Sequence, residues 1–154
     1  MGYDIRDIID KALDVASKRK GLYSSLMDIN PNVRVRFVIN TLLIQVDKDI
    51  KLFNELKQSI TDDIAEEIDF DIYDKISSLV YQFNRILIKP NIRTSDELLN
   101  FALDVEEKQY ALFVDIQGRL VKDNVLVESQ AYLMLNKIIE VREKNIKNIK
   151  YFIK

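Results

Sequence analysis

The chain has 154 residues and a net charge of −2, with 47% hydrophobic and 31% charged residues, a composition typical of one globular domain spanning residues 1–154. It has no cysteine and no histidine, which excludes disulfides, thiolate metal sites and cysteine nucleophiles, and removes the commonest metal ligand and general base. No apolar run approaches the roughly 18 residues that cross a bilayer, and no secretory signal opens the chain, so we expect a cytoplasmic protein.

Helical periodicity begins near the N-terminus. We expect a first helix over 4–27 and a second over 31–57, where Asn30 and Pro31 suggest a cap followed by a proline at the first helical position. The second helix has apolar residues spaced by three and four, which places them on one helix face. They are Ile39, Leu42, Leu43, Val46, Ile50 and Phe53. This pattern is typical of an amphipathic helix.

The middle of the chain predicts a long crossover between helices. The acidic stretch "TDDIAEEIDFDIYD" precedes a shorter helix expected over 71–87. Two further long helices are expected over 95–120, opened by a capping box at 94–97, and over 124–152. The apolar residues of the last helix are Leu135, Ile139, Ile146, Ile149 and Ile153. With three glycines and two prolines in the whole chain, the sequence predicts an all-α, antiparallel four-helix bundle.

An internal repeat relates the first and third long helices. The tetrapeptide Ala-Leu-Asp-Val begins at Ala12 and again at Ala102, an offset of 90 residues, and Tyr23 then matches Phe113. In the second and fourth helices, "DIKLFNEL" parallels "NIKNIKYFI" at an offset of 96. In the same two helices, "NVRV" at Asn32 parallels "NVLV" at Asn124 at an offset of 92, which differs from 96 by four residues, about one helical turn, so these helices keep phase but not register. The simplest interpretation is two duplicated helix hairpins joined by the crossover.

From about Ile8 to Phe152 the chain resembles the rubrerythrin-like branch of the ferritin-like superfamily. The segment "TSDELLNFALDVEEKQYALFVDI" looks like that family's third helix, and "DKDIKLFNEL" and "REKNIKNIKYF" look like the ends of its second and fourth helices. The resemblance implies a bundle that binds two iron or manganese ions. The ligands would be one Glu from each of the first and third helices and a Glu-x-x-His pair from each of the others.

When these ligand positions are carried over to this chain, most of them hold residues other than the family's Glu and His ligands. They fall on Ser17, Val46, Asp49, Glu107, Arg142 and Asn145. Glu107 alone keeps the family's residue; Val46 has no donor atom, and Arg142 adds a positive charge. If the fourth helix is shifted by one turn, its pair becomes Ile138 and Val141, which cannot bind metal either. The resemblance therefore implies a kept fold and a lost dimetal site, with no cofactor.

We accordingly expect a non-catalytic bundle with a structural or protein-interaction role, acting as a homo-oligomer, in particular a dimer, or with another protein partner. One alternative is a diverged oxidoreductase, ferroxidase or peroxidase that binds a cation through Asp49 and Glu107. Another is nucleic-acid binding through Lys18, Arg19, Arg34 and Arg36, although a solvated helix surface explains these charges more simply. We expect no binding to a membrane.

Two expectations concern the bundle interior. Tyr23, Phe37, Phe53 and Phe113 form an aromatic stripe that we expect in the core. Glu107 and Arg142 should both point inward, so that a guanidinium replaces the lost metal as the counter-charge of a buried carboxylate. Asn145 and Asp49 would complete this network.

Overall fold

The computed structural model describes residues 2–122 and 129–153. These residues form five helices: α1 Ile5–Ile29, α2 Val33–Gln58, α3 Phe70–Ile86, α4 Ser95–Lys122 and α5 Gln130–Phe152. Two short strands, β1 Tyr3–Asp4 and β2 Glu67–Ile68, pair in antiparallel orientation. The prediction of an all-α bundle with a shorter helix in the crossover is confirmed. The expected start of the last helix at 124 lies outside the described residues.

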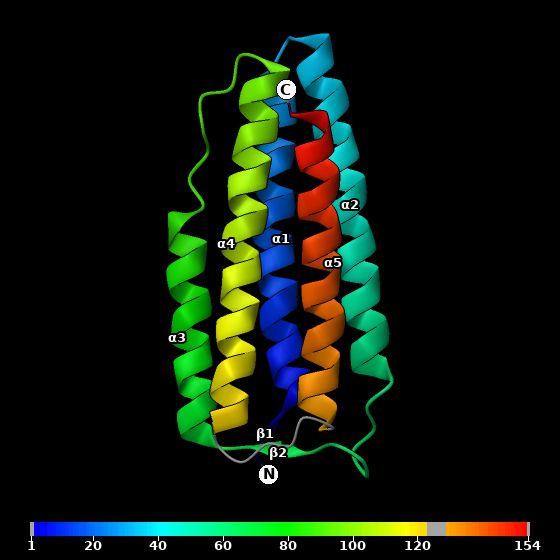
Figure 1. Cartoon of the computed structure of the whole chain (residues 1–154), viewed down its shortest axis with the longest axis vertical. Helices are drawn as coiled ribbons and strands as arrows, with labels where there is room; N and C mark the ends of the chain where they lie inside the picture. Colours follow the sequence, from blue (N-terminus) through cyan, green and yellow to red (C-terminus); the bar gives the residue numbers. More distant parts are fainter. Residues whose placement is uncertain (1, 123–128, 154) are drawn as a thin grey trace.

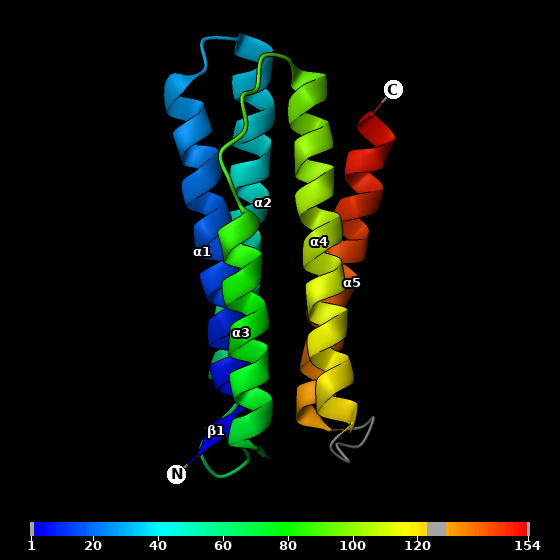
Figure 2. The same ribbon diagram turned by 90° about the vertical axis from the view of Figure 1, so that its left-hand side faces the viewer.

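The two helices of each hairpin run in opposite directions. In Figure 1, α1 and α5 run upward and α2 and α4 run downward, so the N-terminus and the C-terminus lie at opposite ends. Packing is closest within the two hairpins, α1 with α2 and α4 with α5. Helix α3 lies outside the bundle against α1 and α4, as Figure 2 shows, and the crossover then continues along the bundle to the start of α4. No described helix has an apolar stretch that could cross a membrane.

Side chains before each long helix define where it begins. Asp4 and Asp7 form a capping box, because the Asp4 carboxylate accepts from the Arg6 N–H and the Asp4 N–H donates to Asp7. The predicted cap at Asn30 is wrong by two residues: Asn32 caps α2, whereas Asn30 ends α1 and donates to the Ile92 carbonyl. Thr94 caps α4 as predicted, accepting from the Glu97 N–H at 3.2 Å.

The two hairpins bury equivalent positions. At the offset of 90, the buried residues Ile8, Ala12, Val15, Ala16, Arg19, Tyr23 and Leu26 of α1 match the buried residues Leu98, Ala102, Val105, Glu106, Gln109, Phe113 and Ile116 of α4. At the offset of 96, Val35, Ile39, Leu42, Val46, Asp49 and Phe53 of α2 match Ala131, Leu135, Ile138, Arg142, Asn145 and Ile149 of α5. Both hairpins therefore turn the same sequence positions toward one continuous core.

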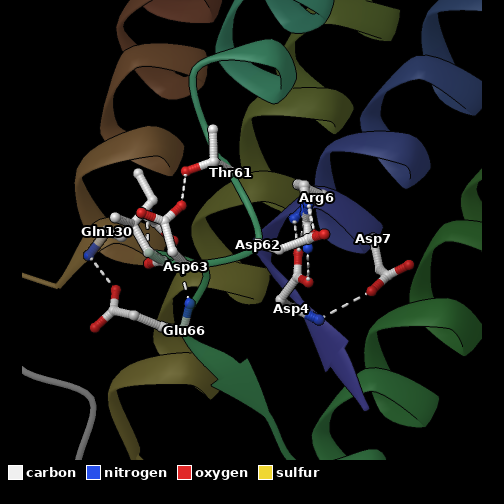
Figure 3. Close-up of polar contacts among 9 residues, drawn as sticks. Asp4, Arg6, Asp7, Thr61, Asp62, Asp63, Glu66 and Gln130 are labelled. Atoms are coloured by element: carbon white, nitrogen blue, oxygen red, sulfur yellow. Dashed lines mark hydrogen bonds and ion pairs between the residues drawn. The ribbon is translucent and has the colours of Figure 1, made fainter. Parts of the chain in front are cut away.

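A polar network ties three chain segments together at the end of the bundle that carries the N-terminus (Figure 3). Arg6 reaches from the start of α1 to Asp62 in the segment after α2, with an Nη1–Oδ1 distance of 2.7 Å. In the same segment, the Glu66 carboxylate accepts from the Gln130 N–H at 2.6 Å, and Gln130 Nε2 donates to the Ile64 carbonyl. The start of the crossover is thus attached to both hairpins.

One member of the expected aromatic stripe is not in the core. Tyr23, Phe53 and Phe113 are buried, but Phe37 is 73% exposed. Phe37 lies between the buried positions Val35 and Ile39 on α2, and two residues correspond to about 200° around a helix. The prediction for Phe37 is therefore wrong because the residue faces away from the bundle.

Candidate functional site: a buried arginine–carboxylate centre

Four charged side chains meet in the middle of the bundle, one from each long helix. Arg19 comes from α1, Asp49 from α2, Glu106 from α4 and Arg142 from α5, and none of them is more than 3% exposed. The helical phase explains this placement, because each residue continues the apolar stripe of its own helix. In α1, for example, Arg19 follows Ala12 and Ala16 at spacings of four and three.

The four groups form a closed ring of opposite charges. Arg19 donates through Nη2 to Asp49 Oδ2 at 2.5 Å and through Nη1 to Glu106 Oε1. The Arg142 Nη2 atom forms an ion pair with the same Asp49 oxygen, and its Nη1 atom lies 3.5 Å from Glu106 Oε2. Each guanidinium therefore bridges two carboxylates, and each carboxylate bridges two guanidiniums. We call these four residues the central ring.

The electrostatic environment keeps Arg19 of the central ring protonated. Burial alone would lower the pKa of Arg19, but the charges of Glu106 and Asp49 outweigh burial and raise that pKa above its ordinary value. Nearby Tyr23 is also buried, and the loss of water raises the pKa of its phenol, so it stays neutral. Two positive and two negative groups cancel, which is the condition under which buried charges are tolerated.

Other polar side chains complete the layer only in part. Gln109 of α4 accepts from Arg142 Nη1 at 3.1 Å. Asn145 is buried one turn further along α5 but makes no hydrogen bond to the central ring among the described residues. The Nε atoms of both arginines and Nε2 of Gln109 also have no hydrogen-bond acceptor in the described parts of the chain. Unpaired buried donors lower stability, so the layer stabilises the fold less than its number of ion pairs suggests.

The predicted site is therefore correct in part. Arg142 points inward and contacts Asp49, as expected, and Val46 is buried in the core. The predicted inward placement of Glu107 and Ser17 is wrong, because both residues are exposed on the outside of their helices. The inward carboxylate is Glu106 rather than Glu107, and the α1 residue is Arg19 rather than Ser17. Asp49 and Glu107 face different environments and cannot share a cation.

The sequence contained a signal that would have placed these residues correctly. Ala102, Glu106, Gln109 and Phe113 follow spacings of four, three and four, and Ala12, Ala16, Arg19 and Tyr23 follow the same spacings. Ser17 and Glu107 each lie five residues after the alanine that begins an Ala-Leu-Asp-Val tetrapeptide, Ala12 or Ala102, which places them well off that helix face. Because the offset of 90 links Ser17 to Glu107, choosing the wrong helix face for one of them also places the other on the wrong face.

The arrangement leaves little room for metal chemistry at the centre. Both inward carboxylates are occupied by guanidiniums, and a cation would have to displace two buried positive charges to reach them. Within residues 2–122 and 129–153, no group of three acidic, cysteine or histidine side chains could hold a metal ion. Comparison of the chain with models of known protein families, with curated proteins and with solved structures gave no match.

Proposed function

We propose that this protein is a non-catalytic ferritin-like bundle that serves a structural or protein-interaction role as a homo-oligomer. The observation that carries the proposal is the central ring, in which two guanidiniums lie between carboxylates of opposite helices. In a ferritin-like bundle that position belongs to the two metal ions. The positive charge that metal supplies in such a bundle would here come from the chain itself.

The two alternatives have less support. An oxidoreductase that binds a cation through Asp49 and Glu107 would need two side chains that face different environments. Nucleic-acid binding through the basic clusters would use Arg19, which is buried, and Arg36, which donates to the Met27 carbonyl at 2.6 Å and helps to end α1. Lys20, in the same cluster as Arg19, also forms an ion pair with Asp47 at 2.8 Å.

The test is to convert the centre into a carboxylate site. The double variant Arg19→Glu/Arg142→Glu would place four carboxylates in one layer, which suits a divalent cation but is costly without one. We expect the wild type, purified without chelator, to contain substoichiometric iron, manganese and zinc and to have a melting temperature that EDTA or Mn²⁺ does not change. The double variant should fold only with added Mn²⁺ or Zn²⁺.

The control is Glu107→Gln, which changes an exposed carboxylate and should leave metal content and melting temperature as in the wild type. Stoichiometric metal in the wild-type protein would overturn the proposal. A double variant that gains no stability from metal would show that the four positions do not have the geometry of a ferritin-like site.

A further inference from the structure

An apolar groove lies at the end of the bundle that carries the C-terminus, far from the acidic network of Figure 3. It has a volume of about 420 Å³ and lies between the first turns of α2 and α4 and the last turn of α5. Phe37, Leu99 and Phe152 provide its apolar lining. Phe37 and Phe152 are 73% and 65% exposed, so each presents most of an aromatic ring to the surroundings.

The exposed apolar surface extends beyond the groove itself. Val33 lies one turn before Phe37 on the same face of α2 and is 79% exposed, and Tyr151, next to Phe152, is 84% exposed. Single exposed apolar residues are ordinary, but several of this size gathered at one end indicate a surface that another molecule covers.

Two unpaired charges flank the groove on opposite sides. Arg34 projects from α2 and Asp96 from α4, and both residues line the groove and are exposed. Neither side chain forms an ion pair with another described residue. The groove therefore has one positive wall and one negative wall on either side of an apolar centre.

This charge arrangement is complementary to itself. Helices α2 and α4 run in the same direction, and both begin at this end of the bundle (Figure 1). A twofold axis through the middle of the groove exchanges its two walls, so α2 of one copy lies against α4 of the other. Arg34 of each copy then meets Asp96 of its partner, and the aromatic side chains pack between them.

The geometry points to a second copy of this chain as the occupant of the groove, in a symmetric dimer held by Phe37 and Phe152 and by two Arg34–Asp96 pairs. This inference rests on the homo-oligomer of the proposed function and names its interface. The proposed function and this dimer interface can fail separately, because metal analysis tests the bundle centre and sedimentation tests the groove.

Sedimentation velocity of the full chain over a concentration series tests the dimer. We expect a reversible monomer–dimer equilibrium. Arg34→Asp or Asp96→Arg alone places like charges opposite each other at two symmetric contacts, and each variant should raise the dimer Kd at least about tenfold. The double variant Arg34→Asp/Asp96→Arg exchanges the two walls and should return the Kd to within about threefold of the wild type. This recovery is specific to contact between two identical copies.

The apolar part of the interface has its own variant. Phe37→Ser should abolish the dimer without lowering the melting temperature of the monomer, since the ring is mostly exposed. Tyr81→Ser is the matched control, because Tyr81 is a comparably exposed aromatic residue on α3, at 64%, and does not line the groove. A wild-type chain that remains monomeric at concentrations on the order of 100 μM would overturn the inference. So would a dimer whose double charge variant is no tighter than the single variants.

Discussion

Arg19, Asp49, Glu106 and Arg142 illustrate how a buried charge depends on its neighbours. Each carboxylate of the central ring has two positive neighbours, and each arginine has two negative ones. Such a group adds little net stability, because the loss of water offsets the attraction between the charges. Removing one member is a different matter, because it leaves an uncompensated charge in the core.

We predict strong non-additivity within the ring. Arg19→Met or Glu106→Leu alone should each lower the free energy of unfolding by about 3–5 kcal/mol, because each leaves the opposite charge without its partner. Arg19→Met/Glu106→Leu removes one charge of each sign and leaves the Asp49–Arg142 pair intact. The double variant should therefore lower the free energy of unfolding by much less than the sum of the two single variants. Urea unfolding of the four proteins measures the cycle.

The neighbouring residue Glu107 provides a matched control for this cycle. Glu107→Leu removes an exposed carboxylate and should change the free energy of unfolding by less than about 0.5 kcal/mol. Equal effects at Glu106 and Glu107, or a strictly additive cycle, would show that the ring does not act as a unit.

The cap at Asp4 should make the stability of the protein depend on pH. The hydrogen bond from Arg6 holds the pKa of the Asp4 carboxyl below its ordinary value of 3.8. The unfolded state therefore binds more protons near that pH, and the stability that Asp4 contributes is lost as the pH falls. Asp4→Ala should lower stability by about 1 kcal/mol at neutral pH, whereas Asp4→Asn keeps most of the cap. The difference in stability between the wild type and Asp4→Asn should become smaller as the pH falls from about 5 to about 2. A constant gap in thermal unfolding over that range would contradict this assignment.

At the scale of the elements, α3 differs from the other helices. It lies outside the bundle and buries only Ile76, Val80 and Phe83 among its own residues. We predict that its backbone amides exchange hydrogen faster than those of α1, α2, α4 and α5, because few apolar contacts hold it in place. Hydrogen exchange followed by mass spectrometry would measure this, and equal protection of α3 and α4 would contradict it.

The elements themselves were the most predictable part of the structure. The spacing of apolar residues placed α1, α2, α3 and α4 within a few residues, because that spacing is a local property of the chain. The inward direction of Arg142 was also predictable, since it interrupts an apolar stripe. The partners of Arg142 could not be obtained in this way, because they depend on the rotation of neighbouring helices. Successive residues lie about 100° apart around a helix, so an error of one residue in the inward direction of α4 exchanges Glu106 for Glu107.

Phe37 shows a second limit of sequence patterns. Its large aromatic side chain next to an apolar stripe predicts a core position, although its phase on α2 places it outside. Hydrophobicity alone does not distinguish a core residue from one that a partner molecule covers. Phe37 is therefore a residue of the groove surface, where its exposed ring can contact a partner.

At the scale of the whole molecule, the two hairpins are joined covalently only through the crossover between α2 and α4. We predict that a protease site inserted between Ile88 and Asn91 can be cut without separating the halves, because the buried face between them remains intact. Size-exclusion chromatography of the cut protein should show both fragments in one peak. Separate elution of the fragments would mean that the crossover, rather than the core, keeps the hairpins together.

The charge order of the central ring differs between the two hairpins, and this difference has a consequence for how they pair. In the first hairpin the arginine is on the first helix and the acid on the second, and in the second hairpin this order is reversed. By the offsets of 90 and 96, the positions of Glu106 and Arg142 correspond to Ala16 and Val46 in the first hairpin. Two paired copies of the first hairpin would therefore lack the acid and the arginine that the second hairpin places at these two ring positions, and would bring one Arg19 from each copy into the same layer. Repulsion between these like charges would disfavour that pairing, although the apolar faces of the two hairpins are equivalent. We infer that the central ring favours pairing of the first hairpin with the second over pairing of either hairpin with a copy of itself.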